Sequence, residues 1–215
     1  MMSTSLTDTA YTTIRKKILT CEYMPGSLLS VYKLAEELKM SRTPISNAIA
    51  RLELEGLVVA LKNRGVMIKE FSSKVIVDMV EVFIAHQLYV LDLVEHSYLY
   101  EFKFNELENI LNQLLKEKEH GNYLEYSNLS FSFTRNFIAT AKNNVMLEIM
   151  DVHQDKMLMS AVANYKQSPQ QRYTGAHYNK AIYDTLIEGN YQRVRQLLTE
   201  WRQKLRERVM MTGSF

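Results

Sequence analysis

The sequence predicts a mainly α-helical protein with two parts: an N-terminal winged helix-turn-helix with a small β-hairpin wing, and an all-α helical bundle. Between residues 41 and 69, one short helical pattern leads into two β-prone runs. From about residue 74 onward, long segments keep a helical apolar period, and Pro169 is the only proline there. We therefore expect a first domain at 1–70, a linker at 71–74 and a second domain at 75–215.

Two helices are expected at the start of the first domain, over residues 12–19 and 31–39. Ile14 and Ile18 lie four residues apart in the first, beside a basic face at 15–17, and a turn follows at 24–26. Residues 28–30 lead into the second helix, for which Ser30 is a candidate N-cap. Its apolar stripe consists of Val31, Leu34, Ala35 and Leu38.

The third helix carries the most specific signal in the chain. Ser41, Thr43 and Pro44 open it, and Gly56 ends it. The inward positions are Ile45, Ala48, Ile49 and Leu52, and the outward positions of the first turns are Arg42, Thr43, Ser46 and Asn47. Short hydrogen-bonding groups with one guanidinium suit phosphates and base edges in a DNA major groove. We expect this helix to read DNA.

A β-hairpin wing is predicted after the third helix. Residues 57–61 and 66–69 are β-prone, and a four-residue loop, Lys62-Asn63-Arg64-Gly65, separates them. Arg64 lies near the tip, where it is either a DNA contact or a solvated charge.

These anchors, in this order and spacing over about residues 10–70, resemble the GntR family of bacterial transcriptional regulators. The resemblance implies DNA contacts from Arg42 and Thr43 of the helix and from Gly65 of the wing. The family usually has Arg-Glu where this chain has Ser46-Asn47, so we expect a shifted operator. The candidate DNA-binding residues are Ser41, Arg42, Thr43, Ser46, Asn47, Arg64 and Gly65.

The second domain is expected to consist of helices separated by readable turns. The helices are predicted at 74–99, 105–120, 123–140, 145–164, 171–188 and 191–211. Most of the turn signals between them are clear: Gly121-Asn122, Lys142-Asn143-Asn144, Gln167-Ser168-Pro169 and Gly189-Asn190.

This half resembles the helical effector domain (FCD) of the FadR-type branch of the GntR family, over about residues 75–210. The resemblance rests on Glu81-Val82, on residues 133–141 with 144–147, and on the segment 182–190. It implies a helical bundle around a small-molecule cavity and a dimer contact.

Many members of this branch hold a metal with one Asp and three His, but the corresponding positions here carry poor ligands. The resemblance places them at Ser130 or Phe131, at Thr134 or Arg135, at Asn179 and at Trp201. We expect no metal and no cofactor, and His177 lies two residues from the required register. The same positions are expected to line a cavity, whose candidate residues are Phe83, Gln87, Thr134, Arg135, Asn179 and Trp201.

Two kinds of effector stay open. Arg135 is the candidate cation for an organic acid, whereas a largely apolar ligand would use Phe83, Phe133 and Trp201. Aromatic residues at helical positions are more often core than ligand contacts. The arginines of residues 193–208 alternate with glutamates and are expected to form a solvated helix face.

Composition excludes several classes of protein. Cys21 is the single cysteine, which excludes an internal disulfide and fits a reducing cytoplasm. We expect neither a membrane-spanning segment nor a signal peptide. The sequence holds no nucleophile–base pair, paired-carboxylate signature or phosphate-binding glycine loop, so it does not predict an enzyme.

The sequence thus predicts a cytoplasmic, homodimeric regulator, more in keeping with a repressor than an activator, that binds double-stranded DNA at a palindromic operator and a small-molecule effector. The alternative is a protein-interaction or structural module of the same fold that has lost specific DNA binding.

Overall fold

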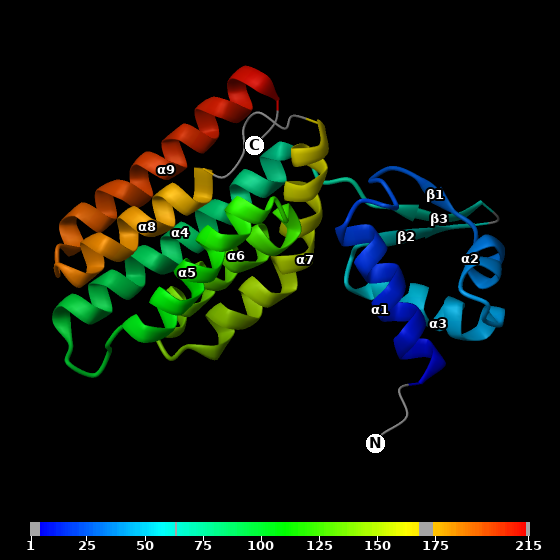
Figure 1. Ribbon diagram of the computed structural model, residues 1–215, viewed down its shortest axis with the longest axis horizontal. Coiled ribbons are helices and arrows are strands. Elements are labelled where there is room, and N and C mark those ends of the chain that lie inside the picture. The colour runs from blue at the N-terminus through cyan, green and yellow to red at the C-terminus, as the bar shows by residue number, and fades with distance from the viewer. Residues whose placement is uncertain (1–4, 63, 168–173, 214–215) are drawn as a thin grey trace. The chain divides into compact units, whose positions relative to one another are not determined.

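A computed structural model describes residues 5–62, 64–167 and 174–213 of the 215-residue chain. The chain divides into two compact units, residues 1–71 and 72–215 (Figure 1). The predicted fold class is confirmed: the first unit contains a small β-sheet beside its helices, and the described part of the second is helical. No helix among the described residues is long and apolar enough to cross a membrane.

The first unit is a winged helix-turn-helix. Its helices are α1 (Leu6–Leu19), α2 (Val31–Glu37) and α3 (Arg42–Leu54), and its strands are β1 (Leu28–Leu29), β2 (Val58–Leu61) and β3 (Gly65–Ile68). The apolar positions of the three helical patterns meet in one core, whose fully buried members include Ile14, Ile18, Leu34, Ile45, Leu52, Leu57 and Ile68. Helical periodicity therefore identified the inward face of each helix.

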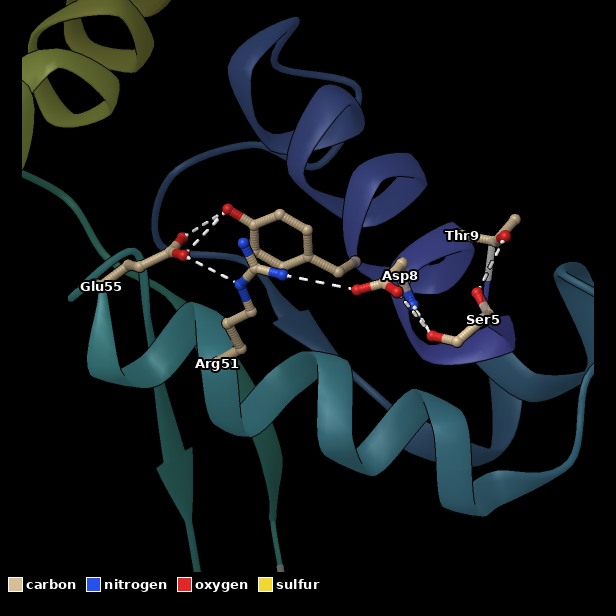
Figure 2. Close-up of polar contacts among 6 residues, drawn as sticks. Ser5, Asp8, Thr9, Arg51 and Glu55 are labelled. Atoms are coloured by element: carbon tan, nitrogen blue, oxygen red, sulfur yellow. Dashed lines mark hydrogen bonds and ion pairs between the residues drawn. The ribbon is translucent and has the colours of Figure 1, made fainter. Parts of the chain in front are cut away.

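Helix α1 begins six residues before the predicted start at Thr12. Ser5 is its N-cap: the Ser5 Oγ accepts a hydrogen bond from the Asp8 backbone N–H (3.1 Å) and donates one to Asp8 Oδ2 (2.7 Å). Figure 2 shows this cap at the start of α1. The cap satisfies donors that would otherwise be unpaired, which lets the helix extend toward the N-terminus.

The wing is part of a three-stranded antiparallel sheet in the order β1-β3-β2. Strand β3 pairs with β2 over residues 65–68 and with β1 through Leu29 opposite Val66. The hairpin of β2 and β3 was predicted from the sequence. Strand β1 was not, because residues 28–30 were expected only to lead into α2. Asn63 of the predicted wing loop lies outside the described residues.

The second unit is built from long helices (Figure 1). They are α4 (Ser73–His96), α5 (Phe104–His120), α6 (Tyr123–Ala139), α7 (Asn144–Gln167), α8 (Thr174–Ile187) and α9 (Tyr191–Thr212). Each predicted helix is present, with ends shifted by up to three residues. The predicted start of α8 at Gln171 and most of the turn at 167–169 lie outside the described residues.

Helix α4 starts inside the predicted linker at 71–74. Ser72 caps it, because its Oγ accepts a hydrogen bond from the Val75 N–H (3.4 Å). The Ser73 Oγ donates to the carbonyl of Gly213 (2.6 Å), which joins the start of α4 to the end of α9. Ser73 and Lys74 therefore belong to the helical bundle rather than to a linker.

Two arginines of α9 also hold α4. Arg195 pairs with Glu95 (2.7 Å), and Arg206 pairs with Glu81. The arginine-rich end of the chain is therefore not only a solvated face, because these two side chains tie α9 to α4.

Candidate DNA-reading surface and effector cavity

The N-terminal end of α3 presents the predicted reading residues to solvent. Ser41, Arg42, Thr43, Ser46 and Asn47 are all exposed, while the interleaved Pro44, Ile45, Ala48 and Ile49 are buried. Ser41 is the N-cap, but its side chain makes no capping hydrogen bond. An exposed helix N-terminus carries unpaired N–H groups and a partial positive charge, which favour a phosphate there.

Tyr32 of α2 is a member of this surface that the sequence did not reveal. Its ring centre lies 5.5 Å from the Arg42 guanidinium carbon, and the ring is 54% exposed. A hydrogen bond to the Glu36 side chain raises the pKa of the Tyr32 hydroxyl, so the ring carries no charge at neutral pH. The only sequence signal was an aromatic residue outside the apolar stripe of α2.

The wing contributes Arg64 and Gly65. Arg64 is exposed, and its N–H donates to the Leu61 carbonyl (3.0 Å). Gly65 has φ +98°, and a Cβ there would lie 2.5 Å from the Leu29 carbonyl oxygen. Gly65 is thus required for the close approach of β3 to β1, whatever its role on DNA.

A polar bracket of Asp8, Tyr11, Arg51 and Glu55 holds α3 against α1. The Arg51 guanidinium interacts with Asp8 (3.6 Å) and Glu55 (3.4 Å), as Figure 2 shows. The Tyr11 hydroxyl donates to the Glu55 carboxylate (2.9 Å). Burial, reinforced by this hydrogen bond, raises the pKa of Tyr11. The bracket fixes the C-terminal half of α3, which orients its reading end.

The second unit encloses a cavity of about 200 Å³ between α4, α6, α7, α8 and α9. Five of the six predicted ligand residues line it: Phe83, Gln87, Thr134, Asn179 and Trp201. Phe133, the other candidate contact for an apolar ligand, is fully buried in the core instead. Tyr178 of α8 also lines the cavity.

Arg135 does not line the cavity, contrary to the prediction. Its guanidinium makes a bidentate pair with Asp151 of α7, with Nε–Oδ1 at 2.6 Å and Nη2–Oδ2 at 2.8 Å. One residue along an α-helix turns the side chain by about 100°. Because Thr134 faces the cavity, Arg135 faces α7. The pair lowers the pKa of Asp151.

Some of the polar side chains in the cavity wall are paired within the protein. The Asn179 Nδ2 donates to Ser130 Oγ (3.1 Å), and the Tyr126 hydroxyl accepts from the Ala176 N–H (2.8 Å). The side chain of Gln87 is 4% exposed and makes no hydrogen bond to another described residue.

The positions that the resemblance gave to metal ligands do meet at this cavity. Ser130, Thr134, Asn179 and Trp201 all line it, but hydroxyl, carboxamide and indole groups are poor ligands for zinc-like ions. His177 is exposed, as its register requires. Within the described ranges, no cluster of three His, Cys, Asp or Glu side chains is placed to hold a metal.

The comparisons with protein families agree with both units. Residues 6–68 match the family described as bacterial regulatory proteins of the gntR family, and residues 102–203 match the FCD domain. The chain is 41% identical over 76 residues to an uncharacterised HTH-type transcriptional regulator in the TAR-I ttuE-ttuC' intergenic region of Agrobacterium vitis. That match covers 35% of this chain and 44% of the relative, so it spans less than half of the relative's length.

Three solved structures share the fold over nearly the whole chain. A GntR regulator from Rhodococcus sp. RHA1 has a TM-score of 0.73 at 19% identity, covering 97% of this chain and 99% of its own. E. coli McbR/YncC has a TM-score of 0.69 at 19% identity, covering 94% and 95%.

The third structure is Lar, reported to control expression of the Listeria monocytogenes agr system. It has a TM-score of 0.68 at 22% identity, covering 99% and 100%. Both matching families consist of transcription regulators and not of enzymes. The chain therefore belongs to the GntR family of bacterial transcription regulators, in its FadR-type architecture of a winged helix-turn-helix followed by an FCD domain.

Proposed function

We propose that this protein is a homodimeric repressor that binds a palindromic operator through residues 1–70 and a small-molecule effector through residues 75–215. The observation that carries the proposal is the exposed start of α3, where Arg42 and four small polar residues face solvent above a fully packed inward face. Arg64 of the wing adds a second cation. The candidate contacts are those predicted from the sequence, with Tyr32 as a neighbour of Arg42.

An exposed stripe on α4 supports the dimer. Val75, Val82 and Tyr89 recur every seven residues and are 38%, 43% and 46% exposed. Apolar side chains at this spacing are typical of a helix that packs against another helix. Two-fold symmetry would then present one recognition helix to each half of an inverted repeat.

The effector would act through the cavity by favouring one placement of the two DNA-binding units over others. With Arg135 paired to Asp151, the cavity lacks the cation on which the organic-acid alternative depended. Because a repressor must reach its operator DNA, we place the protein in the bacterial cytoplasm.

Selection of DNA fragments by the purified full-length protein tests this function. We expect one enriched inverted repeat, which the protein shifts in a gel at physiological salt. Equal retention of all fragments would favour the alternative, a protein-interaction module of the same fold.

Light scattering of the unaltered protein and of Tyr89→Asp tests the dimer, which the added charge should dissociate.

A further inference from the structure

The side chain of Gln87 is a buried polar group aimed into the effector cavity without a partner. It lines the cavity, is 4% exposed, and makes no hydrogen bond to another described residue. Most carboxamides inside folded proteins are hydrogen-bonded to protein or to water, so an unpaired one that is open to a cavity calls for an explanation. A bound molecule that pairs with this carboxamide is such an explanation. Gln87 offers that molecule both N–H donors and a carbonyl acceptor.

The remaining wall is uncharged over the described residues. Its polar atoms come from hydroxyl, phenol, indole and carboxamide groups. Two aromatic pairs contribute to the apolar surface. Phe83 lies edge-on to Phe131, with ring centres 5.8 Å apart, and the ring centres of Tyr178 and Trp201 are 4.7 Å apart. The wall is therefore suited to an aromatic or aliphatic body.

Neither Arg135 nor Lys204, which is hydrogen-bonded to the wall residue Tyr178, lines the cavity. Arg135 is paired with Asp151, and the exposed Lys204 has its Nζ 5.6 Å from the centre of the Tyr178 ring. A carboxylate moved from water into such a site loses its hydration without gaining an ion pair, which is costly. A neutral molecule avoids that cost.

We propose that the cavity binds an uncharged, largely apolar molecule whose head group both donates and accepts hydrogen bonds, and that this head group pairs with the Gln87 carboxamide. The inference deepens the proposed function, on which it rests, by naming the chemical class of the effector. Aromatic amides fit this class, and so do neutral heterocycles that carry both a hydrogen-bond donor and an acceptor. Free carboxylic acids do not.

Two probes of equal size, 2-naphthamide and 2-naphthoate, separate the neutral from the anionic case. Trp201 is the chain's single tryptophan and lines the cavity, so its fluorescence reports binding directly; calorimetry confirms the stoichiometry. In the full-length protein at neutral pH, we expect saturable binding of naphthamide and binding of naphthoate weaker by about tenfold or more. Equal or tighter binding of naphthoate, or no binding of naphthamide, would overturn the proposal.

The role of Gln87 is tested with Gln87→Leu, which keeps the size but removes the hydrogen bonds. We expect naphthamide binding to weaken by about fivefold, while binding of naphthalene is retained. Gln113→Leu is the matched control, because Gln113 is exposed on α5 away from the cavity. Unchanged naphthamide binding in Gln87→Leu would remove Gln87 as the partner. If this variant does not fold, the comparison of the two probes on the unaltered protein still decides the charge of the ligand.

These titrations contain no DNA, so they separate the two claims. Failure to bind an operator in the absence of any ligand would contradict the proposed function. Failure to prefer the amide over the acid would contradict the class of effector, even in a protein that binds its operator normally.

Discussion

The guanidinium carbon of Arg51 lies 3.6 Å from the centre of the Tyr11 ring, so a cation of α3 rests against an aromatic ring of α1. Arg51 also pairs with Asp8 of α1 and Glu55. Its side chain is 52% exposed, which limits the strength of each ion pair through solvent screening. The contact nevertheless joins the recognition helix to the first helix at a defined point.

Arg51→Met should destabilise the first unit by about 1 kcal/mol, because it removes a cation–π contact and two screened ion pairs. Hydrogen exchange measured on peptides from residues 5–20 should become faster, while exchange in α5 stays unchanged. Arg64→Met serves as the control, since Arg64 is an exposed wing residue outside the bracket. Unchanged exchange in α1 would show that the bracket does not stabilise the unit.

Gly65→Ala should destabilise the sheet of the first unit by about 1–3 kcal/mol. Alanine is strained at φ +98°, and its Cβ would meet the Leu29 carbonyl oxygen at 2.5 Å. Denaturation and hydrogen exchange of residues 58–68 measure the effect. Gly121→Ala provides a comparison, because Gly121 has a similar positive φ but an open surrounding. A smaller effect at Gly65 than at Gly121 would contradict the role of the close approach.

Periodicity and capping were enough to predict most of the first unit. The inward positions of α3 and the two hairpin strands follow from local sequence patterns. The apolar residues of these patterns are the ones that pack in the core. Strand β1 could not be predicted, because two residues form a strand only through pairing with β3, which is distant in the chain. The start of α1 depends on one cap, Ser5, in a segment where Ala10 is the single buried residue between Leu6 and Tyr11.

The cavity shows where the sequence resemblance stops being sufficient. Ser130, Thr134, Asn179 and Trp201 meet as the resemblance implies. The choice between Thr134 and Arg135 depended on a shift of a single residue, and a helix turns by about 100° over that distance. Only the packing of α6 against α7, where Asp151 receives the guanidinium, decides it.

Arg135→Ala should therefore leave ligand binding unchanged and lower stability only slightly, by a few tenths of a kcal/mol to about 1 kcal/mol. The pair is bidentate, but its side chains are 36% and 46% exposed. Naphthamide titration and thermal unfolding check both parts, with Asp151→Asn as the reciprocal variant. A strong loss of ligand binding in Arg135→Ala alone would place Arg135 in the cavity after all.

Stability should fall as the pH drops through the range where free histidine takes up a proton. Burial lowers the pKa values of His86 and His153, and Lys156 lowers that of His153 further. The Nδ1 atoms of both are buried without a hydrogen-bond partner. With lowered pKa values in the folded state, these histidines bind protons more tightly in the unfolded chain. Their contribution to stability is therefore complete above the unfolded pKa of about 6.5. It is lost as the pH falls from there to the lower folded pKa.

Urea denaturation of the helical unit between pH 7.5 and 5 measures this dependence. The double variant His86→Gln/His153→Gln should show a flatter pH profile than the unaltered protein. The exposed His120, in the last turn of α5, offers the control substitution His120→Gln. An equally steep profile in the double variant would assign the pH dependence to other groups.

Whether the start of α3 reads DNA is tested most directly by the affinity of Arg42→Ala for the selected operator at fixed salt. A guanidinium that pairs with a base edge contributes about 1–3 kcal/mol of discrimination. Arg42→Ala should thus lose roughly tenfold or more in operator affinity while its thermal unfolding is unchanged. Arg64→Ala should weaken binding to all sequences and lower the salt slope by about one unit, and Arg202→Ala in the second unit should do neither. An unchanged operator affinity in Arg42→Ala would show that the start of α3 does not read DNA through Arg42.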